Sequence, residues 1–256
     1  MKLSLCIATY NEEAFIHYPL DSVYDIADEV IIVDGGSTDK TLEIARSYGK
    51  KVRVIETDNP PMFHINKQKA IEAAKGEWIL QLDADEALSP ELKKEIEMVI
   101  GSEKSEVSGY WINRQNFFLT RFLKKGGIYP DATIRLYKNK AATFPRKDVH
   151  ENVNIEGEVG SLKSDILHYA DPDFARYLAR WNRYTTLDAD MILKKKEHLC
   201  APCYLFGKPV VTFFSIYFRH KGFQDGFAGF VWAAFSALRY WVIYIKVWQK
   251  QTSSLK

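Results

Sequence analysis

The sequence lacks the features that would place it in several common protein classes. It has three cysteines in 256 residues, too few for a disulfide framework. Cys200 and Cys203 have CxxC spacing, but no second CxxC is present to complete a zinc site, and Cys6 lies in an apolar run. We therefore expect three reduced thiols in a cytoplasmic protein. The N-terminus has no apolar run long enough for a signal peptide, so export by that route is not expected.

Charge excess and the common nucleotide-binding motifs are also missing. The formal net charge is only +2, which gives no overall field that would favour nucleic acid as a partner. Neither GxGxxG nor GxxxxGK[ST] occurs, so the fingerprints of dinucleotide-binding folds and P-loops are absent. The hydrophobic content of 46% is enough for a full core, in one large domain or in one domain with an appendage.

The first hundred residues contain a regular alternation of strand and helix patterns. Short apolar runs at residues 3–8, 29–33, 52–55 and 78–82 indicate buried parallel strands. Helical spacing separates these runs, and Ser37 or Thr38 could cap the second helix. This alternation predicts an α/β fold with right-handed crossovers.

A further helix is expected after the fourth strand. Ser89 can cap it, Pro90 suits its first turn, and apolar residues follow at helical spacing.

Polar side chains follow three of the predicted strands. They are Thr9, Asn11 and Glu12 after the first, Asp34 after the second, and Asp83 and Asp85 after the fourth. The carboxyl ends of parallel strands share one edge of a sheet, so this set suits a nucleotide bound across that edge. A divalent cation, Mg²⁺ or Mn²⁺, held by a carboxylate could neutralise the diphosphate as it leaves. The alternative is a solvated turn, since Asp-x-Asp also arises by chance among 33 acidic residues.

These segments, in their order and spacing, resemble the signatures of family 2 glycosyltransferases with the GT-A fold. The matching segments are 9–13, 33–39 and 76–86. The resemblance implies a Rossmann-like, mostly parallel sheet flanked by helices, with Asp34 on the nucleotide base, Asp83 on the ribose and Asp85 on the metal. Many members have two acids where this chain has Asp34-Gly35, so here the base contact falls to Asp34 alone. Lys67 stands where a basic residue usually meets the donor; the alternative is a solvated helix residue.

The middle of the chain contains the candidate for a catalytic base. Inverting sugar transfer needs a carboxylate to deprotonate the acceptor hydroxyl, and we choose Glu151, in the run Asp148-Val149-His150-Glu151. A turn of surface charges is the alternative. Segments from residue 118 to residue 169 resemble lipopolysaccharide core β-1,4-glucosyltransferases, a likeness that spans about residues 3–250 and supports Glu151.

Three further assignments accompany this resemblance. A histidine beyond the base often completes the metal shell in GT-A enzymes, and His168 is the candidate; a buried, hydrogen-bonded histidine is the alternative. Arg135, Lys124 and Lys125 are candidates for contact with an anionic acceptor or a donor phosphate, as is His150 for the acceptor. Each of the three cations could equally be a surface charge.

The last third of the chain is aromatic and basic. Residues 227–245 form a segment long enough to span a membrane as a helix. Inserting Arg239 near its centre, however, would cost ~2.5 to 3.5 kcal/mol on insertion scales. Trp and Tyr interleaved with Arg and Lys suit helices that lie in the headgroup plane. The alternative is a helical pair buried against the catalytic domain or a second subunit, which would make a homo-oligomer.

We therefore predict a GT-A catalytic domain at residues 1–170, with a nucleotide-sugar half (1–105) and an acceptor half (106–170), and a helical extension at 171–256. The predicted function is inverting, metal-dependent transfer of a hexose, glucose from UDP-glucose being preferred, to a saccharide or lipid-linked acceptor in cell-envelope glycan biosynthesis. The enzyme is expected in the cytoplasm, with peripheral contact at the inner membrane face. The alternatives are a nucleotide-sugar-binding scaffold without transfer activity and a protein or peptide glycosyltransferase.

Overall fold

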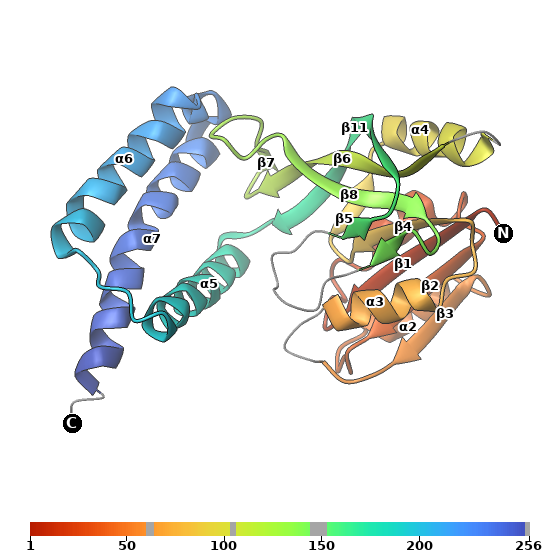
Figure 1. Ribbon diagram of the computed structural model, residues 1–256, viewed down its shortest axis with the longest axis horizontal. Helices are drawn as coiled ribbons and strands as arrows, with labels where there is room; N and C mark the ends of the chain where they lie inside the picture. Colours follow the sequence, from red (N-terminus) through yellow and green to blue (C-terminus); the bar gives the residue numbers. More distant parts are fainter. Residues whose placement is uncertain (60–63, 103–105, 144–152, 254–256) are drawn as a thin grey trace. The chain divides into compact units, whose positions relative to one another are not determined.

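A computed structural model describes residues 1–59, 64–102, 106–143 and 153–253 (Figure 1). The chain divides into two compact units. The first unit comprises Met1–Gln115 and Asp131–Tyr169, and the second comprises Asn116–Pro130 and Ala170–Lys256. The segment Asn116–Pro130 therefore groups with the C-terminal residues.

Four parallel strands form one half of the sheet of the first unit. They are β1 (Leu3–Thr9), β2 (Glu29–Asp34), β3 (Val52–Glu56) and β4 (Trp78–Asp83), in the order β3-β2-β1-β4. All four strand predictions are confirmed to within one residue at each end. The register places Thr9 opposite Asp34 and Ala8 opposite Asp83, so these three strands end at one edge.

Helices cover both faces of this half of the sheet. They are α1 (His17–Val23), α2 (Thr41–Ser47), α3 (His64–Glu72) and α4 (Pro90–Gly101). Side chains from α1, α2 and α4 pack in one core with Leu5 and Ile7 of β1. Ala70 and Ile71 of α3 pack in the other core with Cys6. The alternation of β1 side chains thus supplies both cores, as expected of a strand buried on two faces.

The other half of the sheet contains antiparallel pairs of strands. Its strands are β8 (Asp131–Lys138), β6 (Val107–Phe118), β11 (Glu158–Asp171) and β5 (Glu86–Leu88), following β4 in that order. The pairs β4–β8, β6–β8 and β11–β5 are antiparallel. A separate small sheet pairs β9 (Ala142–Thr143) with β10 (Asn154–Ile155). The predicted α/β class is therefore confirmed.

One of the two predicted helix caps differs from the expectation. The predicted cap of α4 is confirmed, because Ser89 Oγ accepts a hydrogen bond of 3.2 Å from Leu92 N. The predicted cap of α2 at Ser37 or Thr38 is wrong: α2 begins at Thr41, and Ser37 Oγ donates to Asp34 instead. A short hydroxyl side chain readily bonds to a neighbouring turn rather than to a helix end.

The second unit is built mainly of helices. They are α5 (Phe174–Lys194), the π-helical η1 (Cys203–Gly207), α6 (Lys208–Phe214), the π-helical η2 (Ser215–Arg219), the 3₁₀ turn η3 (Gly222–Asp225) and α7 (Gly226–Ser253). The short strand β7 (Arg121–Phe122) pairs with the end of β6. Asp173 caps α5 by accepting from Arg176 N at 2.8 Å.

The cysteine prediction is wrong for two of the three residues. Cys200 and Cys203 are joined by a disulfide, whereas Cys6 is free and buried. CxxC spacing is compatible with a thiol pair or with a disulfide, and the sequence around it did not distinguish them.

Candidate active site at the carboxyl edge of the parallel strands

Three carboxylates lie in or beside the turn that follows β4. Asp83 is the last residue of β4, Asp85 lies in the turn, and Glu86 begins β5. Glu86 Oε2 accepts a hydrogen bond of 2.9 Å from Asp83 N, and Asp85 O accepts one of 2.8 Å from Tyr169 N. Strand β11 therefore fixes the turn from the side, since it also pairs with β5.

Asp85 faces a histidine across this turn. His168 Nε2 lies 3.5 Å from Asp85 Oδ1, and the two side chains are 13% and 16% exposed. Burial lowers the pKa of His168, the charge and hydrogen bond of Asp85 together with the charge of Glu86 raise it, and the net shift is upward. The structure thus brings together the two residues that the sequence analysis assigned to the metal.

The metal-ligating atoms of Asp85 and His168, a carboxylate oxygen and an imidazole nitrogen, fit a divalent cation that is bound together with a diphosphate. Magnesium is commonly held by one or two carboxylates plus substrate phosphate oxygens. Within the described residues, no group of three or more His, Cys, Asp or Glu side chains could hold a metal ion. Asp85 and His168 would therefore supply two ligands, and phosphate oxygens of a substrate would have to supply others.

Asp83 is held by two buried cations. Lys67 Nζ lies 2.5 Å from its Oδ1, and Arg135 Nη2 lies 2.6 Å from its Oδ2. Burial alone would raise the pKa of Asp83, but the charges of Arg135 and Lys67 hold it well below the usual value. The Asp83 carboxylate is consequently ionised and fixed in direction, and its side chain keeps 27% exposure, so a ligand can still reach it.

Glu86 extends this network beneath the turn. It is fully buried, and its Oε1 lies 2.7 Å from Arg135 Nη2 and 3.2 Å from Arg114 Nη1. Arg135 also donates to Gln81. Burial lowers the pKa of Arg135, and Asp83 and Glu86 raise it by more. In the structure, Lys67 and Arg135 bind carboxylates beside the turn. The sequence analysis had instead assigned Lys67 to the sugar donor and Arg135 to an anionic acceptor or a donor phosphate.

The loops after β1 and β2 are hydrogen-bonded to each other at the carboxyl edge of the parallel strands. Asn11 Oδ1 accepts from Thr38 N at 2.8 Å, Glu12 N donates to Thr41 Oγ1 at 2.8 Å, and Gly35 N donates to Thr9 O at 2.9 Å. Asn11 has a positive φ of 53°, a conformation that asparagine tolerates better than most residues. Both the backbone conformation of Asn11 and its side-chain hydrogen bond therefore help to connect the two loops.

Asp34 forms the turn of the second loop. It is fully buried and accepts from Gly36 N at 2.9 Å, from Ser37 N at 2.8 Å and from Ser37 Oγ. The carboxylate thus shapes the loop where the nucleotide base was expected. Beside it, Thr9 Oγ1 is buried and has no hydrogen-bond partner in the described part of the chain.

An aromatic pair near Asp85 was missed from sequence. The rings of Tyr18, in α1, and Tyr169, at the end of β11, stack with centroids 4.0 Å apart and planes 6° apart. His17 lies against Tyr18 at 4.2 Å. Nothing in the local sequence pairs these tyrosines, because the contact depends on how α1 and β11 are placed in the first unit.

Several predicted site residues are not part of this cluster. His150 and Glu151 lie outside the described residues, so the assignment of the base stays a prediction. Lys124 and Lys125 belong to the second unit, where their backbone N–H groups donate to Asp225 Oδ2 at 3.1 Å and 2.8 Å.

Known proteins resemble this chain in sequence. Residues 4–149 match the family described as Glycosyl transferase family 2. A glycosyltransferase of Rickettsia bellii is 32% identical over 243 residues, which covers 90% of this chain and 80% of the relative. The lipopolysaccharide core biosynthesis glycosyltransferase LpsC of Rhizobium meliloti is 26% identical over 254 residues, covering 98% and 93%.

Solved structures resemble it in fold. The mannosyltransferase PcManGT from Pyrobaculum calidifontis, in complex with GDP-Man and Mn²⁺, superposes with a TM-score of 0.55 at 13% identity, covering 96% of this chain and 86% of that one. Residues 1–349 of S. aureus TarS, in complex with UDP-GlcNAc, give a TM-score of 0.50 at 20% identity, covering 96% and 88%. At these identities the likeness is one of fold.

Proposed function

Since the chain belongs to glycosyl transferase family 2, we propose that it is an inverting, metal-dependent hexosyltransferase. The donor is UDP-glucose, and the acceptor is a hydroxyl of a saccharide or lipid-linked glycan of the cell envelope. The observation that carries this proposal is the turn after β4, where Asp83 is fixed by Lys67 and Arg135 while Asp85 faces His168.

The metal site of the proposal consists of Asp85 and His168. A bound Mg²⁺ or Mn²⁺ would neutralise negative charge on the departing diphosphate. The Asp85 carboxylate is an oxygen ligand of the type that both ions prefer, and His168 can coordinate through Nε2 when it is neutral.

The nucleotide site comprises the ends of β1, β2 and β4. Asp83 accepts from a ribose hydroxyl, because its ionised carboxylate is both fixed and reachable. Thr9, Asn11, Glu12 and Asp34 form the two bonded loops that receive the base, and the unpartnered Thr9 hydroxyl offers one polar contact there. Lys67 acts on the donor through Asp83, its partner.

The transfer step assigns the base to Glu151. Its carboxylate takes the proton of the acceptor hydroxyl, and the acceptor oxygen bonds to the anomeric carbon. The bond from that carbon to the diphosphate oxygen breaks on the opposite face, and UDP leaves with the bonding electrons. Configuration at the anomeric carbon is therefore inverted. His150 and Lys124 are assigned to the acceptor.

One relative supports the proposed class of acceptor. LpsC is described as a lipopolysaccharide core biosynthesis enzyme, and we extend that class of acceptor to this chain. Such acceptors are assembled at the inner face of the cytoplasmic membrane, so the enzyme acts there from the cytoplasm. Transfer to a protein or peptide would use the same donor site and differ only in the acceptor.

Calorimetry with UDP-, GDP- and dTDP-sugars, with and without Mn²⁺ or Mg²⁺, tests the donor site, and a hydrolysis assay tests turnover. We expect metal-dependent binding of UDP-glucose and slow hydrolysis. Glu151→Gln should abolish transfer while leaving donor binding unchanged, and the exposed Glu158→Gln is the matched control. Wild-type transfer by Glu151→Gln would refute the assignment of the base. Binding without any turnover would identify a nucleotide-sugar-binding scaffold instead.

A further inference from the structure

One face of α7 is a continuous apolar stripe. Its large side chains are between 40% and 76% exposed and recur three to eight residues apart; they are Phe227, Phe230, Leu238, Trp241, Ile245 and Trp248. This spacing places them along one side of the helix. Gly222–Ser253 is the one helical stretch of the described chain with the length and hydropathy to cross a membrane, yet only 33% of its most apolar window is buried.

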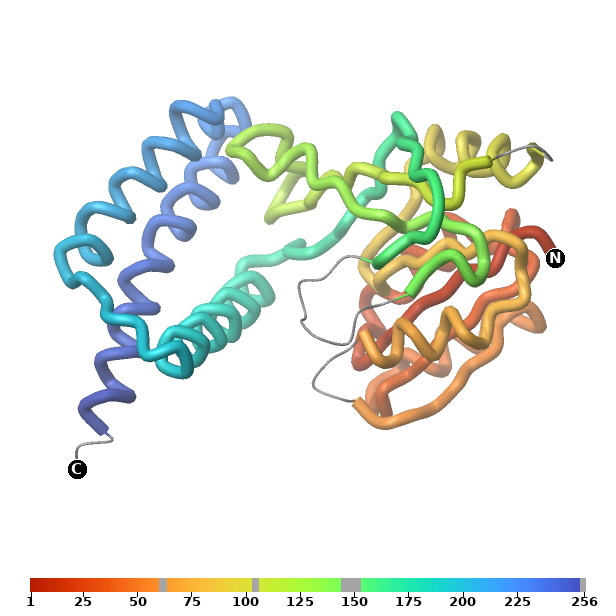
Figure 2. The backbone as a smooth tube through the Cα atoms, in the orientation of Figure 1, coloured from red at the N-terminus to blue at the C-terminus, as the bar shows by residue number. Residues whose placement is uncertain are grey.

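The stretch η1–α6–η2 carries a second exposed stripe. Phe206, Val210, Phe214 and Phe218 lie four residues apart, and with Val211 they are 53% to 67% exposed. Helices α6 and α7 run side by side in the second unit (Figures 1 and 2).

Contacts join α7 to the stretch η1–α6–η2 at two places. The rings of Phe213 and Tyr217 each lie 5.9 Å from that of Phe230, and Trp241 Nε1 donates to Leu205 O at 2.5 Å. We name the combined surface of the two stripes the hairpin face.

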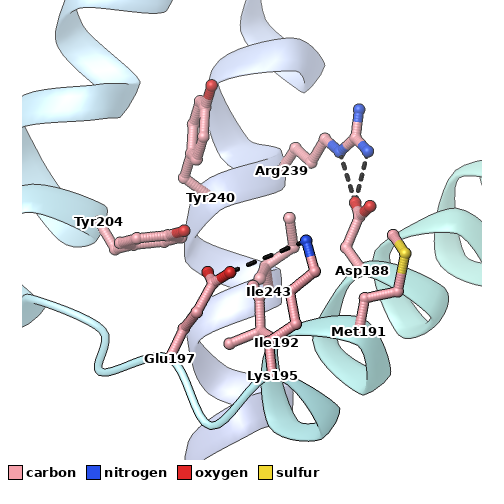
Figure 3. Close-up of a pocket in the computed structure, with 9 residues that line it drawn as sticks. All are labelled: Asp188, Met191, Ile192, Lys195, Glu197, Tyr204, Arg239, Tyr240 and Ile243. Atoms are coloured by element: carbon pink, nitrogen blue, oxygen red, sulfur yellow. Dashed lines mark hydrogen bonds and ion pairs between the residues drawn. The ribbon is translucent and has the colours of Figure 1, made fainter.

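Another side of α7 is polar and is bonded to α5. Arg239 pairs with Asp188, and Lys250 pairs with Asp190. Figure 3 shows the first of these pairs in the lining of a pocket of about 370 Å³. The other lining residues come from α5 and α7, together with Lys195, Glu197 and Tyr204.

Lys246 strengthens the same side. Its Nζ donates to Asn182 Oδ1 at 2.7 Å and to Thr185 Oγ1 and Thr186 Oγ1 at 2.8 Å. If α7 crossed a bilayer, it would carry these charged groups into the hydrocarbon, which is costly. A helix with one apolar side and one charged side instead suits the plane of the membrane interface.

The charged side chains of the hairpin formed by η1, α6, η2, η3 and α7 are almost all positive. Between residues 198 and 253 the only acid is Asp225, whereas there are six bases: Lys208, Arg219, Lys221, Arg239, Lys246 and Lys250. Asp225 is buried and accepts from the backbone of Lys124 and Lys125. Arg219 and Lys221 make no ion pair within the described residues and flank the tip of the hairpin next to Phe218.

We infer that the hairpin face docks on an anionic phospholipid bilayer, with α6 and α7 lying in the membrane plane. The apolar stripes enter the boundary between headgroups and acyl chains, and Arg219 and Lys221 meet lipid phosphates. A second copy of the chain is a poorer occupant, because residues 198–253 offer no exposed acid to pair with Arg219 and Lys221 of another copy. The inference rests on the proposed function only in that a lipid-linked acceptor would lie at the same surface.

Flotation of the full chain with vesicles tests this inference. Wild type should float with vesicles of phosphatidylcholine and phosphatidylglycerol, and much less with phosphatidylcholine alone. Phe227→Asp combined with Trp248→Asp should reduce the partition coefficient at least tenfold. Arg219→Gln and Lys221→Gln should each reduce it about fivefold, since a cation near an anionic surface contributes about a factor of that size. Met98→Asp, at an equally exposed apolar residue of the first unit, is the matched control and should change nothing.

Each other outcome overturns a defined part of the inference. If wild type does not float with anionic vesicles, the docking surface is refuted. If it forms a dimer that Phe227→Asp dissolves, a second copy covers the face. If it resists extraction by alkaline carbonate, α7 spans the bilayer instead of lying in its plane.

Binding of UDP-glucose is measured on the same samples. The hairpin variants should bind the donor as wild type does. Flotation without donor binding would refute the proposed function and leave the membrane inference intact. Donor binding and transfer to a soluble acceptor without flotation would do the reverse.

Discussion

The two sides of the turn after β4 carry the same chemical group in opposite surroundings. On one side, Asp83 is bonded to the buried cations Lys67 and Arg135, which hold its pKa well below the usual value. On the other, Asp85 Oδ1 lies 3.5 Å from His168 Nε2. A carboxylate already neutralised by two cations is a poor ligand for a metal ion. A carboxylate beside a histidine is a better one, because the imidazole can lose its proton when the metal ion binds. The roles that we propose for them, a ribose contact for Asp83 and a metal ligand for Asp85, therefore rest on their different surroundings and not on residue type.

The largest effect should come from removing Asp85, the carboxylate that we propose as the metal ligand. We expect Asp85→Asn to lower transfer on the order of 10³-fold, because charge stabilisation by a metal contributes several kcal/mol to the transition state. Folding should change little, since Lys67 and Arg135 keep their partners Asp83 and Glu86. Transfer rates with UDP-glucose and denaturant unfolding check both halves, and near-normal transfer would show that Asp85 is not needed for metal-dependent catalysis.

The complementary change should act chiefly on stability. Asp83→Asn leaves Lys67 and Arg135 without a full counter-charge, and breaking a buried ion pair costs about 3 to 5 kcal/mol. Urea unfolding should therefore show a loss of about 3 kcal/mol. The control is Asp25→Asn, which breaks the surface pair with Lys93 and should cost less than about 1 kcal/mol. Equal losses in the two variants would mean that the Asp83 network is not structurally important.

Removing one of the two cations should have a smaller effect. Lys67→Met fills a similar volume and leaves Asp83 paired with Arg135. We expect KM for the donor to rise about tenfold with kcat nearly unchanged, since one lost hydrogen bond to a charged group is worth about 1.5 kcal/mol or more. A fall in kcat with an unchanged KM would assign Lys67 to the chemical step.

The smallest effect should come from the aromatic pair beside Asp85. Tyr18→Leu removes a stacked ring and should destabilise by about 1 kcal/mol. Tyr169→Phe retains the ring and should be nearly neutral. Thermal unfolding of both variants checks this. A larger loss in Tyr169→Phe than in Tyr18→Leu would transfer the role from the rings to the hydroxyl group.

Features with local signals could be predicted from the sequence. The four parallel strands follow from short apolar runs, and the start of α4 follows from Ser89 and Pro90, which act on adjacent backbone groups. The convergence of Asp34, Asp83 and Asp85 on one edge could be predicted because parallel topology brings strand ends together. The pairing of His168 with Asp85 came from the family resemblance.

Features that depend on distant pairings could not be predicted. Arg135 reaches Asp83 because β8 lies against β4, and no local pattern encodes that register. The same holds for the stack of Tyr18 on Tyr169. The disulfide of Cys200 and Cys203 was missed because CxxC spacing alone does not fix the redox state. Glu151 remains a prediction from sequence.

Manganese binding in the presence of UDP, followed by electron paramagnetic resonance, tests the division between the two carboxylates most directly. Wild type and Asp83→Asn should both bind Mn²⁺, the latter with an affinity reduced only through its weaker hold on UDP. Asp85→Asn should lose most of the binding at the same UDP saturation. Unchanged Mn²⁺ binding by Asp85→Asn, with loss in Asp83→Asn, would contradict the account.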